Sequence, residues 1–242
     1  MFQGEPVAAL VVAAGLSQRM GGLDKTMAPL GGRPVLAHSV ETFLSVPLVE
    51  EIMVVLHPER LEGGRQLARE RGWPAHVRFC AGGARRQDSV RLGLEETGGE
   101  GWVLIHDAAR PLFTPALVER GMEAAAGTGA AIPGIAPSDT MKRVSERGLV
   151  RETLPREQLL SIQTPQVFRR GLILQAHHRF ATSAQNFTDD AALLEALGWP
   201  VATFPGEIHN FKITTPEDLQ RAELVLVQSS DLSRSSYRGG SA

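Results

Sequence analysis

Short runs of apolar residues alternate along the chain with longer segments of amphipathic pattern. The runs are too short for helices and too continuously apolar for exposed strands, which predicts buried β-strands. These strands are expected at Val7 to Val12, Ile52 to Leu56, Val77 to Phe79, Val103 to Ile105, Ala130 to Ile132 and Val201 to Phe204. The segments between them predict helices at Pro34 to Leu44, Glu59 to Arg71, Asp88 to Glu96, Pro115 to Ala126, Arg169 to Ala181, Asp189 to Leu197 and Pro216 to Gln228.

The alternation of strand and helix, from residue 7 to about residue 135, determines the fold class. Strands that are joined through a helix run parallel, and such crossovers are right-handed. We therefore predict an α/β fold with a doubly wound, mostly parallel, Rossmann-like sheet, in a single domain that covers residues 1–228. Ligands of such sheets bind beyond the carboxyl ends of the strands, so the loops that follow strands are where chemistry is expected.

The alternation breaks between Pro137 and Arg156. Here Thr140 to Val144 and Leu149 to Thr153 flank the polar turn sequence Ser145 to Gly148, which predicts a β-hairpin. The hairpin has few apolar residues to bury, and an isolated hairpin is only marginally stable. It either lies on its own domain as a surface hairpin or projects as an arm that packs on another chain.

Composition narrows the classes of partner. Lys and Arg number 25 against 27 Asp and Glu, for a net charge of -2, so we expect neither nucleic acid nor an anionic membrane as a partner. No apolar run approaches the ~20 residues that cross a bilayer, and the apolar start lacks the basic residues of a signal sequence. The single cysteine, Cys80, excludes an internal disulfide and fits a reducing cytoplasm, which is the predicted location. The tail, 229–242, is rich in Ser, Gly and Arg and is expected to be disordered.

The loop after the first strand begins Ala13-Ala14-Gly15 and continues to Lys25. Its small residues let backbone N–H groups approach an anion closely, and Arg19 and Lys25 add positive charge. The spacing matches neither the dinucleotide fingerprint nor the P-loop. The pattern favours a phosphate-binding loop, and the alternative is a mobile turn with two solvated cations.

A second loop, 81–90, follows the third strand and opens a helix. Gly82 and Gly83 permit close approach of the backbone, and the N-terminus of the helix favours anions. Ser89 either contacts a ligand here or caps the helix, as Asp88 also could.

The third loop, His106 to Pro111, places Asp107 at the carboxyl end of another strand. In a phosphate site such a carboxylate serves a magnesium ion or a ribose hydroxyl. The structural alternative is an ion pair between Asp107 and Arg110. His106 is expected to be a hydrogen-bonded residue at the strand end rather than a metal ligand, and His177 and His178 are expected to be exposed on a helix.

Taken together, these segments resemble those of the 2-C-methyl-D-erythritol 4-phosphate cytidylyltransferase family. The resemblance runs in order from residue 7 to about residue 227, and its most specific segments are HDAARP at 106–111 and QTPQ, followed by Val167 and Phe168, at 163–168. The other segments that carry it are the Ala-Ala-Gly loop with Arg19-Met20 and Lys25, Gly82-Gly83 to Ser89-Val90, Thr188-Asp189-Asp190 and Asn210-Phe211-Lys212.

The resemblance implies a fold of the nucleotide-diphospho-sugar transferase type and a transfer that depends on Mg²⁺ or another divalent cation. CMP would pass from CTP to 2-C-methyl-D-erythritol 4-phosphate, a sugar-alcohol phosphate, with release of pyrophosphate, in the non-mevalonate route to isoprenoids. It implies catalytic roles for Arg19, Lys25, Arg156 and Lys212, nucleotide binding by Ala13, Ala14, Gly15, Gly83, Ser89, Asp107 and Ala108, and acceptor binding by Arg110, Thr140, Arg156, Thr164 and Lys212. Asp107 is the candidate metal ligand, with the CTP phosphates as the alternative. The hairpin, about 137–156, would be a homodimerisation arm that brings Arg156 to the partner's site.

Other functions are open at this point. Ribitol 5-phosphate cytidylyltransferases share much of the pattern, and the first loop is also similar to that of molybdenum-cofactor guanylyltransferases, against which HDAARP and QTPQ argue. A nucleotide-binding module without turnover is a third alternative, because a sheet with phosphate loops does not imply catalysis. A dehydrogenase is disfavoured by the missing dinucleotide fingerprint.

Overall fold

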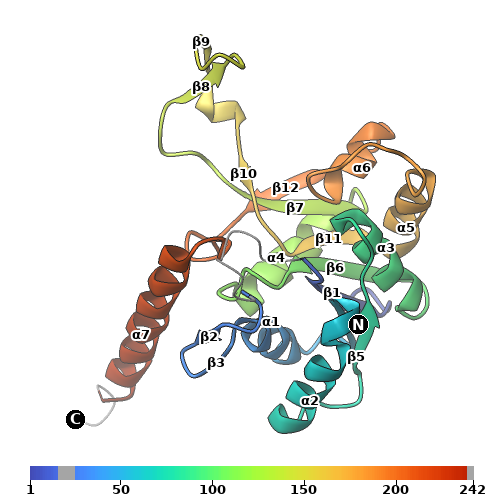
Figure 1. The fold of residues 1–242 in the computed structure, drawn as a ribbon, viewed down its shortest axis with the longest axis vertical. Coiled ribbons are helices and arrows are strands. Elements are labelled where there is room, and N and C mark those ends of the chain that lie inside the picture. Colours follow the sequence, from blue (N-terminus) through green and yellow to red (C-terminus); the bar gives the residue numbers. More distant parts are fainter. Residues whose placement is uncertain (16–24, 239–242) are drawn as a thin grey trace.

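A mixed sheet forms the centre of the molecule in the computed structural model, which describes residues 1–15 and 25–238, with side chains described as far as Gln228. Its strands are β1 (Val7–Ala13), β4 (Glu51–Leu56), β5 (Val77–Ala81), β6 (Trp102–Asp107), β7 (Ala130–Ile135), β10 (Ser161–Ile162), β11 (Gln166–Arg169) and β12 (Ala202–Pro205). Within the described residues the order is β10-β7-β11-β6-β1-β4-β5, and β12 pairs with β7 (Figure 1). A two-residue ribbon, β2 (Pro29–Leu30) and β3 (Arg33–Pro34), lies outside this sheet.

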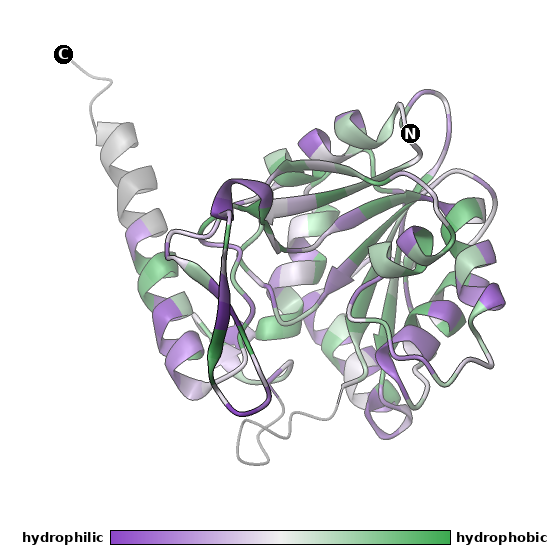
Figure 2. Cartoon of the chain, turned by 90° about the horizontal axis from the view of Figure 1, so that it is seen from above, coloured by the Kyte–Doolittle hydropathy of each residue, from purple (hydrophilic) through white to green (hydrophobic). Residues whose placement is uncertain are grey.

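Helices cover both faces of the sheet, as a doubly wound fold requires. They are α1 (Val35–Leu44), α2 (Leu61–Arg71), α3 (Arg86–Glu96), α4 (Pro115–Ala125), α5 (Arg170–Arg179), α6 (Ala191–Ala196) and α7 (Pro216–Arg238), with short 3-10 turns η2 (Pro58–Arg60) and η3 (Arg156–Gln158). In β1, Ala9 and Val11 join the apolar cluster beneath α1, α2 and α4, whereas Leu10 joins the cluster beneath α3, α5 and α6. Figure 2 shows that hydrophobic residues are concentrated in the central strands.

The predicted α/β class holds because β1 pairs in parallel with both β4 and β6, and β4 pairs in parallel with β5. The sequence pattern missed β11, which lies antiparallel between β6 and β7. This strand has four residues, begins with the buried polar Gln166 and leads directly into α5, so neither a long apolar run nor a turn sequence marks it. Because β1, β4, β5 and β6 run parallel to one another, their carboxyl ends meet at one edge of the sheet.

The last helix, α7, extends beyond the predicted end at Gln228 to Arg238. Residues 229–238 were expected to belong to a disordered tail, yet they continue the helix because the chain has neither proline nor glycine between Glu217 and Arg238 to interrupt it. Residues 239–242 of that tail lie outside the described residues.

The predicted hairpin is present as β8 (Met141–Val144) and β9 (Val150–Leu154), an antiparallel pair. It projects from the body of the molecule (Figure 1), and every side chain of β8 is exposed. Of the two predicted alternatives, the structure therefore shows a projecting arm rather than a hairpin that packs on its own sheet. We refer to residues 137–156 as the arm.

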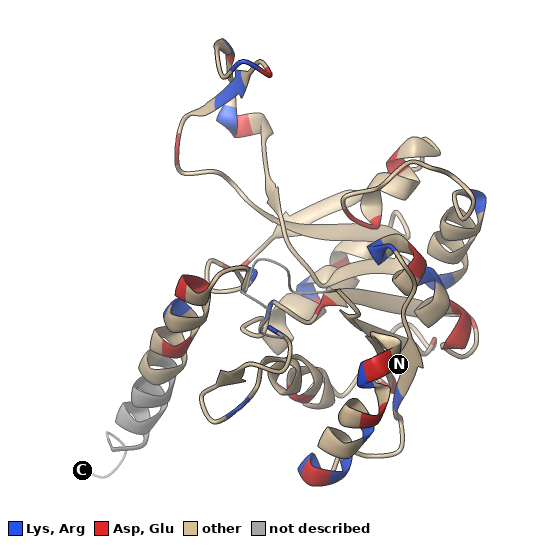
Figure 3. Ribbon diagram, in the orientation of Figure 1, with Lys and Arg blue, Asp and Glu red and all other residues tan. Residues whose placement is uncertain are grey.

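In the view of Figure 3, neither basic nor acidic residues gather on one face of the molecule. Residues of both signs are interspersed over α2, α7 and the arm. Within the described part of the chain, no helix is long and apolar enough to cross a membrane.

Candidate functional site

A cavity of about 490 Å³ lies at the edge of the sheet where β1, β4, β5 and β6 end. Its size is in the range of small-molecule sites. Its lining residues are Val12, Ala13, Ala14, Gly15, Lys25, Thr26, His57, Gly83, Ala84, Arg85, Arg86, Ser89, Asp107, Ala109 and Lys212. Three loops that the sequence singled out thus meet at one cavity, together with Lys212 from the segment after β12.

Small residues bring two of these loops into contact. A Cβ added at Gly82 would lie 2.4 Å from Ala14 Cβ, so only glycine lets the loop after β5 approach the loop after β1 this closely. Ser89 Oγ accepts a hydrogen bond from the Gly83 N–H at 3.0 Å and lies 3.1 Å from the Arg85 carbonyl oxygen, to which it can donate. The Ser89 side chain therefore connects the glycine loop to the start of α3. Of the two residues that were predicted as possible caps, Asp88 is the one whose carboxylate accepts from the Arg85 N–H.

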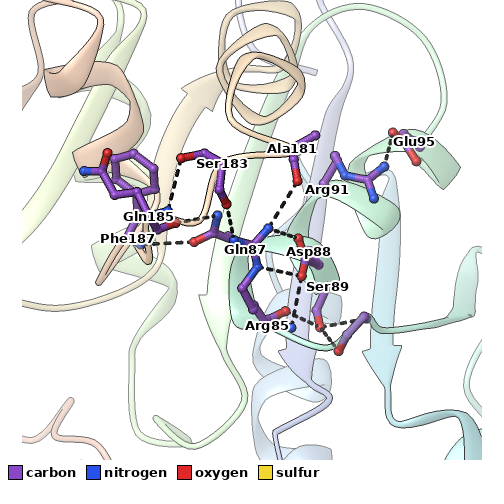
Figure 4. Close-up of polar contacts among 11 residues, drawn as sticks. Arg85, Gln87, Asp88, Ser89, Arg91, Glu95, Ala181, Ser183, Gln185 and Phe187 are labelled. Carbon is purple, nitrogen blue, oxygen red and sulfur yellow. Dashed lines mark hydrogen bonds and ion pairs between the residues drawn. The ribbon is translucent and has the colours of Figure 1, made fainter.

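The start of α3 is also attached to a distant segment, 181–187 (Figure 4). The Arg85 guanidinium binds the Asp88 carboxylate and donates to the Ser183 and Ala181 carbonyl oxygens at 2.6 and 3.2 Å. The Gln87 amide contacts the same segment through Gln185 O and Phe187 N. The Arg85 guanidinium thus donates to acceptors within the protein, and it stabilises the wall of the cavity.

Asp107 provides the only carboxylate among the described lining residues, and two cations face it. Its Oδ1 accepts from Arg86 Nε at 3.0 Å, and its Oδ2 accepts from Lys212 Nζ at 2.6 Å. Burial alone would raise the pKa of Asp107, but Arg86 and Lys212 hold it well below its ordinary range. The carboxylate is therefore ionised at neutral pH, and the predicted alternative pair with Arg110 is not its main contact.

Arg86 links this cavity to the interior. Its Nη2 lies 2.8 Å from Oδ2 of Asp190, which is fully buried, and His177 Nε2 lies 3.2 Å from Asp190 Oδ1. The expectation that His177 is exposed was wrong, since only 3% of it is accessible, whereas His178 is exposed as expected. The reason is that α5 packs this side chain against the carboxylate at the start of α6, a partner that its own sequence neighbourhood does not contain.

His106 is neutral and has one defined tautomer. Burial lowers its pKa to about 3, although the neighbouring Asp107 opposes this. Its Nε2 lies 3.1 Å from the Arg110 carbonyl oxygen, which can only accept, so Nε2 carries the proton. Nδ1 must then accept from the Thr164 hydroxyl at 3.0 Å, and the Thr164 oxygen in turn accepts from the Asp107 N–H at 3.0 Å. His106 is thus a hydrogen-bonded residue at the strand end, as predicted.

The other predicted site residues that the structure describes are not among the residues that line the cavity. Ala108 is fully buried, and Thr164 is buried where its hydroxyl accepts from the Asp107 N–H. The Arg110 guanidinium donates to the Asn210 and Ile162 carbonyl oxygens at 2.9 and 3.2 Å. Thr140 and Arg156 lie exposed on the arm, where Arg156 donates to the Ser138 carbonyl oxygen at 2.8 Å. Arg19 lies outside the described residues.

The sequence pattern indicates no role for Arg86 or Asp190, although both belong to the network of charges in contact with Asp107. A signal was present: Arg85 and Arg86 stand side by side at the start of a predicted helix, where the helix dipole disfavours positive charge. Two cations at such a position require carboxylates nearby. The sequence did not indicate that Asp107 and Asp190 would be those carboxylates for Arg86.

The described residues contain no group of three or more His, Cys, Asp or Glu side chains that could hold a metal ion. Asp107 is the single carboxylate of the described lining, and each of its oxygens has lone pairs beyond its contact with Arg86 or Lys212. One carboxylate fits a magnesium ion that takes its other ligands from phosphates and water. The described lining carries four cationic side chains, Lys25, Arg85, Arg86 and Lys212, and one carboxylate, Asp107. Arg85 and Arg86 are also paired with Asp88 and Asp190, which lie outside the lining. This arrangement suits a polyphosphate ligand and reactions that need positioning and positive charge rather than a protein nucleophile.

Comparison with known proteins identifies relatives with this architecture. Residues 7–228 match the family described as 2-C-methyl-D-erythritol 4-phosphate cytidylyltransferase (IspD). An enzyme of that name from Dehalococcoides mccartyi is 47% identical over 226 residues, which cover 93% of this chain and 98% of the relative. Another, from Halalkalibacterium halodurans, is 41% identical and covers 90% and 96% of the two chains.

Solved structures agree with the sequence comparison. The crystal structure of 4-diphosphocytidyl-2C-methyl-D-erythritol synthase from Anaerococcus prevotii superposes with a TM-score of 0.84 at 29% identity, over 93% of this chain and 97% of the other. The 2-C-methyl-D-erythritol 4-phosphate cytidylyltransferase from Thermus thermophilus gives a TM-score of 0.74 at 36% identity, over 91% and 98%.

Proposed function

Because the chain belongs to the 2-C-methyl-D-erythritol 4-phosphate cytidylyltransferase family, we propose that the cavity beyond β1 binds CTP and that its lysines act on the phosphates. The activity itself follows from the family: CMP is transferred from CTP to 2-C-methyl-D-erythritol 4-phosphate in the non-mevalonate route to isoprenoids. The family, fold class and activity predicted from the sequence are confirmed. The observation that carries the proposal for the site is the meeting of the Gly15, Gly83 and Asp107 loops with Lys25 and Lys212 at one cavity.

The reaction forms a bond from an acceptor phosphate oxygen to the α-phosphorus of CTP and breaks the bond from that phosphorus to the pyrophosphate oxygen. The acceptor phosphate is already ionised, so no strong base is required. The site must supply orientation and positive charge that is in place before the reaction. Asp107 holds Lys212 Nζ at 2.6 Å, and Lys25 lines the same cavity, so we assign both lysines to the phosphates. Arg19 is proposed for the same role from the sequence alone.

The nucleotide-binding roles of Ala13, Ala14, Gly15, Gly83 and Ser89 are supported by their place in the cavity wall. The small side chains of Ala13, Ala14, Gly15 and Gly83 leave room for backbone donors and acceptors to meet the edge of a base. We expect these loops to select cytosine over a purine by shape.

The family typically uses a divalent cation, and we propose Mg²⁺. The CTP phosphates and Asp107 would hold it, and when bound it would neutralise phosphate charge and assist the departure of pyrophosphate. Asp107 is ionised and lines the cavity, which fits this role.

We further propose that the active protein is a homodimer in which the arm of one chain reaches the cavity of the other. Apolar side chains on the arm are uncovered in one chain: Val144, Leu149 and Val150 are 57%, 66% and 62% exposed. Thr140 and Arg156 lie on the same arm and outside the lining of their own cavity, so a partner's cavity is where they would meet the acceptor. Closed two-fold symmetry is the commonest oligomeric arrangement. Arg110 and Thr164, which are engaged with protein atoms, are proposed to support the acceptor site from behind.

Pyrophosphate release tests the proposed substrates. The protein is assayed with Mg²⁺ and CTP, GTP, ATP or UTP, each with 2-C-methyl-D-erythritol 4-phosphate or with ribitol 5-phosphate. We expect release only with CTP and only when 2-C-methyl-D-erythritol 4-phosphate is present. Comparable turnover with GTP would contradict the assignment of the cavity to cytosine, and preference for ribitol 5-phosphate would contradict the acceptor.

Mixed variants test the shared site. Arg156→Ala and Lys25→Ala chains, each nearly inactive alone, should recover part of the activity after subunit exchange, because one site of the mixed dimer then contains both native residues. Sedimentation should show a dimer. A fully active monomer, or mixed dimers without recovery, would contradict a shared site. The cytoplasmic location and the absence of nucleic-acid partners stay predictions from composition.

A further inference from the structure

Charged and polar side chains form a continuous chain of contacts from the cavity into the interior. Lys212 Nζ contacts Asp107 at 2.6 Å, Arg86 Nε contacts the other Asp107 oxygen at 3.0 Å, and Arg86 Nη2 contacts Asp190 at 2.8 Å. His177 lies beyond, 3.2 Å from the second oxygen of Asp190. The chain joins the carboxyl end of β6, the start of α3, the start of α6 and the end of α5.

Burying these charges costs free energy of desolvation, and a gain in the stability of the fold does not explain why they are buried. Asp190 is fully buried and the Arg86 side chain is 26% exposed. Desolvation of a buried ion pair commonly cancels its attraction, and apolar residues of similar volume often give equal or greater stability. A buried carboxylate and guanidinium directly behind a cavity residue therefore suggest a contribution to the site rather than to the fold.

The geometry of Arg86 shows what that contribution is. Its planar guanidinium is held on two sides at once, by Asp107 at Nε and by Asp190 at Nη2. This leaves Arg86 little freedom to rotate, and it fixes the plane of the Asp107 carboxylate. The other Asp107 oxygen is then presented to Lys212.

We propose that Asp190 and Arg86 are positioning residues, which hold the Asp107 carboxylate, and through it Lys212, in place for the transfer. Asp190 also keeps Arg86 directed at carboxylates, so that Arg86 does not compete with Lys212 for the phosphates. This inference rests on the proposed function, because it assumes that Lys212 acts on the phosphates.

The test compares Asp190→Asn with the double variant Arg86→Met/Asp190→Asn. The single variant keeps the shape of the side chain but leaves Arg86 with one carboxylate. The double variant removes one positive and one negative charge, so the charge balance is restored. Asp107 still lacks its contact with Arg86 in this variant. Arg170→Met is the matched control: Arg170 is also partly buried, with hydrogen bonds to Thr97 and the Leu94 carbonyl oxygen, and it does not line the cavity.

For both Asp190 variants, kcat should fall by about 10–100-fold, since misplacement of a reacting group by about 1 Å has an effect of that size. KM for CTP should change less than about threefold, because the lost interaction acts in the transition state. Thermal unfolding should show that the double variant is more stable than the single variant, although kcat is not restored. The control should keep its kcat.

A purely structural role predicts another pattern. Double-variant kcat equal to that of the wild type, or a kcat of Asp190→Asn equal to that of Arg170→Met, would overturn the proposal. If Asp190→Asn does not fold, the double variant carries the same test. A wild-type protein that releases no pyrophosphate from CTP and acceptor would contradict the proposed function instead, so the two failures are distinguishable.

Discussion

Asp107→Asn should destabilise the protein at neutral pH and do so less in acid. The substitution keeps the size of the side chain and one acceptor oxygen, but it removes the negative charge that faces Arg86 and Lys212. Both cations stay in place, so the variant isolates the effect of this one charge.

The size of the effect follows from the two contacts. Oδ1 accepts from Arg86 Nε at 3.0 Å and Oδ2 from Lys212 Nζ at 2.6 Å. A hydrogen bond to a charged group contributes about 1.5–3 kcal/mol, but Lys212 is 35% exposed and solvent screens its share. With one acceptor oxygen kept, we expect a loss of about 2–3 kcal/mol in the free energy of unfolding at pH 7. For a chain of this size that lowers Tm by about 5–10 °C.

The pH dependence has a defined sign. Burial would raise the pKa of Asp107, but Arg86 and Lys212 hold it far below the ordinary value of 3.8. A depressed pKa stabilises the folded state above the unfolded pKa, and this contribution is lost as pH falls toward the folded pKa. Between pH 7 and pH 3 the difference between wild type and Asp107→Asn should therefore shrink by about 1 kcal/mol.

Urea unfolding of both proteins at pH 7 and pH 3 measures this difference. Other carboxylates titrate in the same range, but they do so in both proteins and cancel. A loss that is equal at the two pH values would refute the reasoning, because it would mean that the shape of the side chain, and not its charge, determines the effect.

Substitutions at four other positions test the cavity and its support. Arg19→Ala and Lys25→Ala should each lower kcat by about 100-fold, as loss of one electrostatic stabiliser does, without loss of folding; near-normal turnover at saturating substrate would argue against a role on the phosphates. Gly82→Ala should weaken CTP binding in calorimetry, because its Cβ would lie 2.4 Å from Ala14 Cβ, and unchanged affinity would show that the loop can yield. Thr164→Val should lower the free energy of unfolding by about 2 kcal/mol, since it leaves two buried hydrogen-bonding groups without their partner, whereas Thr164→Ser should be near neutral.

The fold could be predicted where burial requires apolar residues. The central strands β1, β4 and β6 are covered on both faces, so their sequences are continuous apolar runs that local pattern detects. The strand β11 was missed because its first residue, Gln166, is buried through a polar contact: its Nε2 donates to Asp189 Oδ2 at 2.8 Å. A side chain that is buried by pairing leaves no hydrophobic signal in the sequence.

The same limit explains which site residues were found. Gly83 lies on the loop after β5, Ser89 lies early in α3 and Asp107 ends β6. All three come just after predicted apolar runs, so the topology of a parallel sheet brings them together without knowledge of any side-chain contact. The role of Arg86 depends instead on Asp190, which is distant in sequence and reaches it only because α6 packs on the face of the sheet that α3 covers. Composition also did not indicate the polyphosphate site. The net charge of -2 is a sum over the whole chain, whereas the electric field at a bound polyphosphate depends on the few cations at one edge of the sheet. Whether such a cation faces the ligand or braces the wall is decided by its carboxylate partners, which only the three-dimensional arrangement identifies.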